Sequence, residues 1–104
     1  MNRPDLQDAL HDRDAVLRAF VAPDGSLKSI PTKIRKRLVV LDLLCQEFEL
    51  GARYPETEVN NRLRAYHLDV AALRRYLVEE GFLDRADGWY WRAGGSTGGD
   101  AANG

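Results

Sequence analysis

The sequence predicts an α+β domain, mostly α-helical, that closes with a β-hairpin. Apolar residues recur three and four positions apart over most of residues 5–80, the spacing of helices with one buried face. Two short segments, 82–85 and 89–92, then flank Ala86-Asp87-Gly88, whose glycine suits a tight turn between strands. With 104 residues, 44% hydrophobic and 30% charged, the chain has the size and composition of one folded domain.

The first helix is expected over residues 5–21, where one face carries Leu6, Leu10, Val16, Leu17 and Phe20. Pro23-Asp24-Gly25 ends it as a turn. Residues 27–30 are expected to be extended, because the residue before Pro31 is biased away from the helical conformation. The chain therefore divides into an N-terminal helix at residues 1–23 and a main domain at residues 24–92.

The second helix is expected to begin at Pro31 and to end at Gly51. Its apolar seam consists of Ile34, Leu38, Leu41, Cys45 and Phe48. A separate face is expected to carry Lys33, Lys36, Arg37 and Val40. The net charge of the chain is only −1, but the ten residues from Lys28 to Arg37 contain five basic side chains and no acid, which predicts a local basic patch.

Two further helices joined by a tight turn are expected next. Arg53-Tyr54 is a brief strand, and Pro55 begins the third helix. Asp69 is well placed to cap the fourth helix, which Gly81 terminates.

The hairpin at residues 82–92 places three aromatic residues in a row. Successive side chains of a strand point to opposite faces, so if Tyr90 faces the core, Trp89 and Trp91 lie on the other side. Either they cover the N-terminal helix, or they are exposed and stack on bases or on a partner chain. Residues 93–104 contain no large apolar side chain and are expected to be a disordered, dispensable tail.

This order of elements is that of a winged helix-turn-helix domain with an extra N-terminal helix and a C-terminal hairpin as the wing. In that architecture the helix after the turn enters the DNA major groove, so residues 69–80 are the expected recognition helix. The expected nucleic-acid-binding residues are Lys33, Lys36, Arg37, Arg74, Arg75 and Arg85. The alternative for Arg74 and Arg75 is a solvated face, or pairing with the acids at positions 79 and 80.

Catalytic and metal-binding patterns are not found in the sequence. The only cysteine, Cys45, lies among apolar residues, which predicts a buried thiol in a reducing compartment, and the acidic N-terminus does not resemble a secretory signal. The two histidines, His11 and His67, form no ligand pair at the usual metal spacings, and neither a phosphate-binding loop nor a nucleophile elbow occurs. A cytoplasmic, non-membrane protein that is not an enzyme and has no cofactor or metal is expected.

Several segments form a combination typical of one bacterial family: Ser29-Ile30-Pro31, Lys33-Ile34-Arg35-Lys36-Arg37-Leu38, Tyr54-Pro55-Glu56-Thr57-Glu58-Val59-Asn60, His67-Leu68-Asp69, Leu73-Arg74-Arg75-Tyr76-Leu77 and Gly88-Trp89-Tyr90-Trp91. On these segments, over residues 24–92, the chain resembles the bacterial domain-of-unknown-function family numbered two thousand and eighty-seven. The resemblance implies a small domain found alone or attached to helix-turn-helix regulators, including arsenic-repressor-type ones, with no established reaction. A threonine or serine commonly follows the tyrosine in that family, so Pro55 departs from the pattern and leaves the cap of the third helix open.

The family pattern singles out Asn60, His67, Asp69, Arg74 and Arg75. Asn60 and His67 are seven positions apart and share a face of a continuing helix, so with Asp69 they could form a small polar site. Alternatively, Asp69 caps its own helix while the other two side chains fix the turn between the helices.

Two functions follow from these expectations. The first is a DNA-binding, transcription-regulatory module, with RNA as a variant ligand. The second is a protein-interaction module that uses the same scaffold without nucleic acid, since fold does not dictate function. A homodimer is expected to form through the N-terminal helix or through the surface of Trp89 and Trp91. A free basic face favours the first function, whereas its occlusion by the acidic first helix favours the second.

Overall fold

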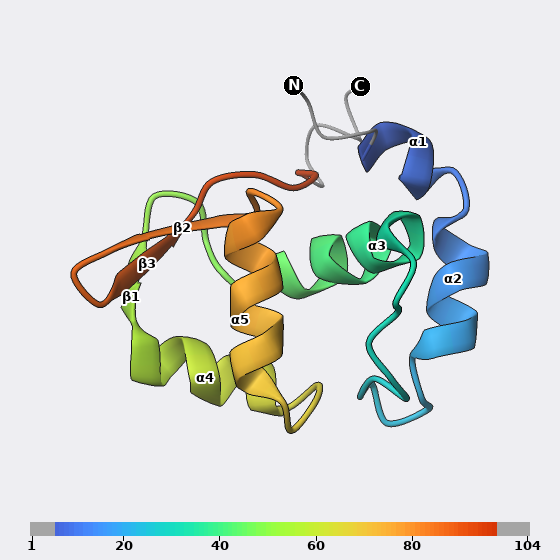
Figure 1. Cartoon of the computed structure of the whole chain (residues 1–104), viewed down its shortest axis with the longest axis horizontal. Helices are drawn as coiled ribbons and strands as arrows, with labels where there is room; N and C mark the ends of the chain where they lie inside the picture. Colours follow the sequence, from blue (N-terminus) through green and yellow to red (C-terminus); the bar gives the residue numbers. More distant parts are fainter. Residues whose placement is uncertain (1–5, 98–104) are drawn as a thin grey trace.

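A computed structural model describes residues 6–97, and within them it confirms the mixed α+β class. Five helices and a small three-stranded antiparallel sheet make up the described chain, about half of which is helical (Figure 1). In chain order these elements are α1 (Leu6–Leu10), α2 (Arg13–Phe20), α3 (Ile34–Cys45), β1 (Arg53–Pro55), α4 (Glu56–Arg64), α5 (Val70–Glu79), β2 (Leu83–Ala86) and β3 (Trp89–Arg92). No helix in residues 6–97 is long and apolar enough to cross a membrane.

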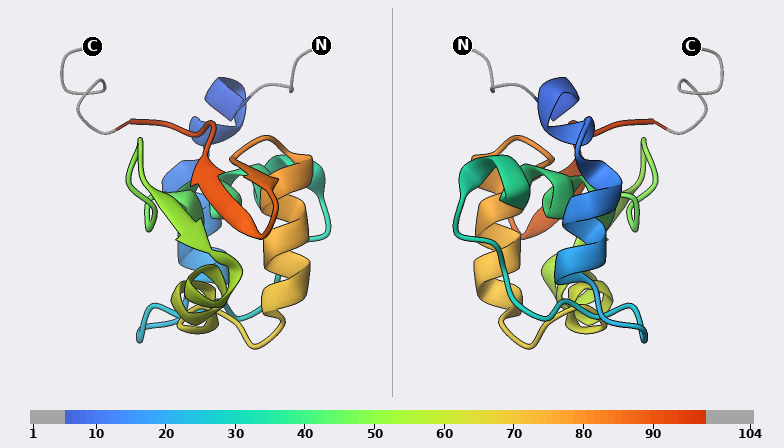
Figure 2. Two further views of the ribbon diagram at one scale, coloured as in Figure 1. Left: turned by 90° about the vertical axis from the view of Figure 1, so that its left-hand side faces the viewer. Right: turned by 90° about the vertical axis from the view of Figure 1, so that its right-hand side faces the viewer.

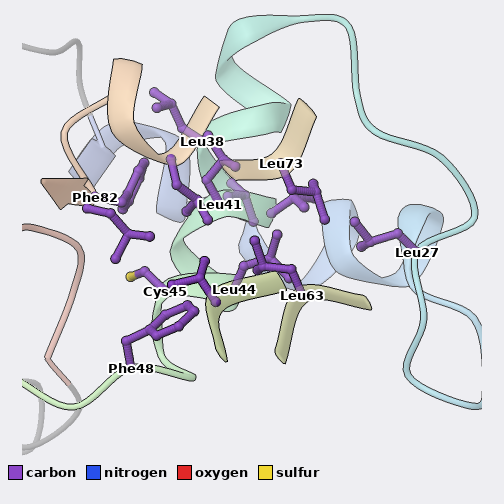
Figure 3. Packing of buried hydrophobic residues seen from close by; sticks show 14 of the residues in the cluster. Leu27, Leu38, Leu41, Leu44, Cys45, Phe48, Leu63, Leu73 and Phe82 are labelled. Carbon is purple, nitrogen blue, oxygen red and sulfur yellow. The ribbon is translucent and has the colours of Figure 1, made fainter. Parts of the chain in front are cut away.

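Helix α3 lies at the centre of the molecule. It runs between α1 and α2 on one side and α5 with the sheet on the other (Figures 1 and 2). Leu38, Leu41, Leu44 and Cys45 of α3 are buried together with core residues from the other elements, including Phe48, Leu63, Leu73 and Phe82 (Figure 3).

The expected division of α3 into a buried and a basic face is wrong in two places. Val40, assigned to the basic face, is fully buried, and Ile34, assigned to the apolar seam, is 41% exposed. The helix also begins at Ile34 rather than at Pro31 and ends at Cys45, well before Gly51. The reason is that elements pack on α3 from two sides, so apolar residues surround its second half instead of forming one stripe.

The expected single helix at residues 5–21 is two helices, α1 and α2, separated by a turn at His11 and Asp12. In a continuous helix the amide of Asp12 would donate to the carbonyl of Asp8, but here it donates to the carbonyl of Ala9 at 3.1 Å. The carbonyl of Asp8 accepts from the amide of His11 at 3.2 Å and from Arg35 Nη2 of α3 at 2.9 Å. A long-range hydrogen bond therefore accompanies the break.

The hairpin is confirmed, and β3 forms the centre of a sheet with the order β1-β3-β2. Asp87 and Gly88 both have positive φ angles of 53° and 83°, as a type I′ hairpin turn requires. Tyr90 is 1% exposed, whereas its neighbour Trp89 is 46% exposed on the opposite face of the sheet. The alternation of side chains is as expected, but the tryptophans do not cover the N-terminal helices, which pack against α3 (Figure 1).

The expectation of a free tail from residue 93 is wrong for residues 94–96. The amide and the hydroxyl of Ser96 donate to the two carboxylate oxygens of Asp42 at 2.6 and 2.7 Å, and Asp42 is only 3% exposed. Gly95 passes so close to Cys45 that a Cβ atom there would clash with the sulfur. Residues 98–104, the rest of the predicted tail, lie outside the described residues, as do residues 1–5.

Candidate nucleic-acid interface

The turn between α4 and α5 is fixed by local hydrogen bonds. The amide of His67 donates to the carbonyl of Leu63 at 3.2 Å, and its ring Nδ1 accepts from the amide of Asp69 at 3.0 Å. Asp69 Oδ1 accepts from the amide of Ala72 at 3.1 Å, so the predicted cap of α5 is confirmed. His67 and Asp69 therefore act in the turn, as one of the two sequence interpretations expected.

Asn60 is not part of this turn. Its side-chain oxygen accepts a short hydrogen bond from Arg74 Nη1, which connects α4 to α5. Asn60 thus binds Arg74, whereas His67 and Asp69 bind groups of the turn. The structure does not join the three side chains in one polar site. The three residues predicted as a polar site serve two separate local structures.

Arg74 belongs to a network that connects α4, α5 and β3. Beyond its bond to Asn60, its Nη2 lies 3.7 Å from Glu56 Oε2, and only 21% of its side chain is exposed. Glu56 Oε1 in turn accepts from the hydroxyl of Tyr90 at 2.9 Å. Sequence reasoning assigned Arg74 to nucleic acid and missed this network, because Glu56 and Tyr90 are 18 residues before and 16 residues after Arg74 in the chain.

Arg75 points to solvent, with 56% of its side chain exposed. Its Nε lies 3.6 Å from Glu79 Oε2, which is the pairing within α5 that the sequence offered as an alternative. Its guanidinium carbon also lies 4.8 Å from the ring centre of Tyr76. Arg75 therefore has a loose ion pair on an open face.

Arg37 is turned inward. Its guanidinium carbon lies 4.3 Å from the ring centre of Tyr76, and its Nη1 donates to the carbonyls of Pro31 and Thr32 at 3.3 and 3.0 Å. Its Nε is buried without a hydrogen-bond partner among the described residues. Arg37 thus connects the start of α3 to α5 rather than presenting a free charge.

The remaining basic residues of α3 and its first turn differ in their surroundings. Lys33 and Lys36 are both exposed, but Lys36 lines a pocket against α2 together with Val16 and Phe20. Arg35 binds Asp8 of α1 and Asp12 of the turn between α1 and α2, and its hydrogen bond and charge lower the pKa of Asp8. The acidic first helices therefore occupy Arg35, which was not among the predicted binding residues.

Three arginines from two elements line one pocket between α5 and the hairpin. Arg74 and Arg75 reach it from α5, and Arg85 reaches it from β2; Glu79 and Tyr90 complete the polar lining of a volume of about 200 Å³. Interaction with the hydroxyl of Tyr90 raises the pKa of Arg85, and Arg85 is exposed. The pocket lining therefore holds three arginines and one carboxylate, that of Glu79, while Glu56 pairs with Arg74 from outside the lining.

Cys45 is unsuited to act as a nucleophile. Burial raises its pKa to about 12, so its thiol is protonated at neutral pH. Within residues 6–97 no three His, Cys, Asp or Glu side chains are grouped so that they could hold a metal ion.

No curated protein and no solved structure matches the chain. Residues 26–92, well over half of the chain, match the protein family described as "Uncharacterized protein conserved in bacteria (DUF2087)". The match includes α3, the two helices of the turn, the hairpin and the pocket between them. The chain therefore belongs to this bacterial family.

Proposed function

We propose that the protein is a winged helix-turn-helix module that binds duplex DNA, with α5 in the major groove and the β2–β3 hairpin as its wing. The observation that carries the proposal is the convergence of Arg75 from α5 and Arg85 from β2 on one solvent-open pocket. A recognition helix and a wing that contact the same stretch of duplex need basic side chains on their facing sides.

The contacts change the roles expected from sequence. We assign the phosphate contacts to Arg75 and Arg85, because both side chains are exposed to solvent. Arg74 positions α5 through Asn60 and Glu56, and Arg37 joins α3 to α5. Lys33, one helical turn before Arg37 and exposed, adds charge near this surface.

The exposed side of α5 is compatible with close approach to DNA. Ala71 is exposed one turn before Arg75, so a small side chain precedes the arginine on the same face. Asp8 of α1 and Asp12 of the turn after it bind Arg35 and leave Arg75 and Arg85 open.

A second function is favoured by the outward face of the sheet. Pairing places Pro55, Trp89 and Ala86 in one row across the three strands, and all three are exposed. In the adjacent row Arg53 stacks over Trp91, with its guanidinium carbon 4.6 Å from the ring centre. Exposed tryptophan and arginine side chains are enriched at protein–protein interfaces. The second function is therefore a protein-interaction module that forms a homodimer through this face of the sheet.

One titration separates the two functions. Labelled duplex DNA, single-stranded DNA and RNA are each mixed with the full chain at about 50 mM and about 150 mM salt, and anisotropy is recorded. The proposal predicts micromolar binding that is tightest for duplex and weakens at the higher salt. Absence of binding to all three at the lower salt refutes it.

The same sample tests the second function. Sedimentation equilibrium of the wild type and of Trp89→Ala shows whether a dimer exists and whether the tryptophan face forms it. A monomer at all concentrations contradicts the homodimer.

A further inference from the structure

We propose that the pocket between α5 and β2 is an anion site that takes one phosphate group, held by Arg75 and Arg85. If the phosphate belongs to a nucleic-acid backbone, this inference rests on the proposed function and names the group that the site binds. If the phosphate is free, the inference is independent of the proposed function. In both cases the chemistry that is recognised is the same.

The pocket has the size for such a group. Its volume is about 200 Å³, which leaves space for a tetrahedral anion and several waters at about 30 Å³ per water. Ala71 and Val78 contribute apolar walls from one face of α5, while Arg85 enters from the facing strand. An anion in the pocket is therefore approached by donors from two elements.

The Arg75 guanidinium retains donors for a ligand. Charge-assisted hydrogen bonds have lengths of about 2.7–2.9 Å, but the Nε of Arg75 lies 3.6 Å from Glu79. Within residues 6–97 the Nη atoms of Arg75 donate no hydrogen bond to another residue. A guanidinium offers a planar pair of N–H groups that matches two phosphate oxygens, so Arg75 has its bidentate edge available.

Arg74 adds charge without being free to move. Its Nη1 is bound to Asn60 and its Nη2 faces Glu56 at 3.7 Å, which holds the guanidinium at the wall of the pocket. Glu79 is the one acid in the lining and competes with an incoming anion for Arg75. A phosphate must therefore displace the loose Arg75–Glu79 pair, and this competition is a testable property of the site.

The experiment is a titration with inorganic phosphate at constant ionic strength, followed through the arginine Nε–H signals in NMR spectra. The expected result is saturable binding that shifts the signals of Arg75 and Arg85. Arg85→Ala should weaken binding about tenfold, the loss of about one charge-assisted hydrogen bond. Glu79→Gln should tighten binding, because it removes the competing carboxylate.

Arg53 provides the matched control, since it lies on β1 at the opposite face of the same sheet. Arg53→Ala should leave phosphate binding unchanged. Phosphate that shifts no arginine signal, or that shifts Arg53 as strongly as Arg85, overturns the proposal. So does a Glu79→Gln variant that binds phosphate no more tightly than the wild type.

A second titration with dimethyl phosphate identifies the source. Binding of this backbone-like diester at the same arginines assigns the site to nucleic acid, and binding of inorganic phosphate alone assigns it to a free phosphate group. Neither titration contains DNA, so an intact phosphate site with no duplex binding refutes only the proposed function. Duplex binding with no phosphate site refutes only this inference.

Discussion

Removal of residues 94–104 should destabilise the protein, because Ser96 binds a buried carboxylate. Asp42 is 3% exposed, and both of its oxygens accept hydrogen bonds from Ser96, at 2.6 Å from the amide and 2.7 Å from the hydroxyl. The carbonyl of Ser96 also accepts from Gln46 Nε2 at 2.8 Å and from Arg92 Nη2. Truncation after Ala93 therefore removes the partners of both Asp42 carboxylate oxygens and of Arg92 Nη2, while Gln46 Nε2 keeps its bond to the carbonyl of Asp42 at 3.3 Å.

The magnitude follows from these bonds. A hydrogen bond to a charged group contributes about 1.5–3 kcal/mol, so the two to Asp42 contribute about 3–6 kcal/mol. Water that reaches the exposed carboxylate after truncation offsets part of this, which leaves about 3 kcal/mol. For a domain of this size, each kcal/mol lowers Tm by about 4–8 °C, so we expect a decrease of about 12 °C or more.

Thermal and urea unfolding followed by circular dichroism measure this effect. Truncation after Thr97 is the matched control and should leave Tm within about 2 °C, because it retains every bond of Ser96. Ser96→Ala should cost about 1.5–3 kcal/mol through the lost hydroxyl, against no change for the exposed Ser29→Ala. If truncation after Ala93 also leaves Tm within about 2 °C, the docking of residues 94–96 is refuted.

Three further predictions concern single residues. Asn60→Ala should lower the free energy of unfolding by about 1.5–3 kcal/mol, because Arg74 loses its acceptor, and an unchanged urea midpoint would contradict the network. Asp69→Ala should cost about 0.5–2 kcal/mol and Asp69→Ser much less, since serine also caps the helix; equal losses would argue against the cap to Ala72. Burial raises the pKa of Cys45 from 9.0 to about 12. The contribution of the protonated thiol to the free energy of unfolding is therefore complete below pH 9 and is lost as the pH rises toward 12. Iodoacetamide should accordingly label Cys45 slowly at pH 8 in the folded protein and rapidly in urea, and equal rates would refute the burial.

Local patterns predicted the parts of the structure that depend on neighbouring residues. The cap of α5 by Asp69 follows from one side chain and the helix after it, and the hairpin turn follows from Asp87 and Gly88. The inward position of Tyr90 follows from strand alternation alone. Each of these features is decided within a few residues.

Features decided by distant residues were not predicted. The break between α1 and α2 involves Arg35, which lies 27 residues from Asp8, and residues 94–96 dock on Asp42, which lies 54 residues from Ser96. Arg74 resembled a free recognition residue because the sequence does not show that Asn60 and Glu56 approach it. Four of the six predicted nucleic-acid-binding residues are exposed as expected: Lys33, Lys36, Arg75 and Arg85. The other two, Arg37 and Arg74, are half-buried.

The salt dependence of duplex binding tests the proposed interface most directly. Phosphate contacts release counterions, so replacing both Arg75 and Arg85 by alanine should weaken binding and lower the slope of log K against log salt by about 1.8, at about 0.9 per contact. This pair is a sharper test than Arg74 with Arg75, because Arg74 also holds α4 and α5 together. Arg53→Ala, on the opposite face of the sheet, should keep the wild-type affinity and slope. A folded Arg75→Ala, Arg85→Ala double variant that retains the affinity and the slope of the wild type would contradict the assignment of α5 and the hairpin as the DNA-binding surface.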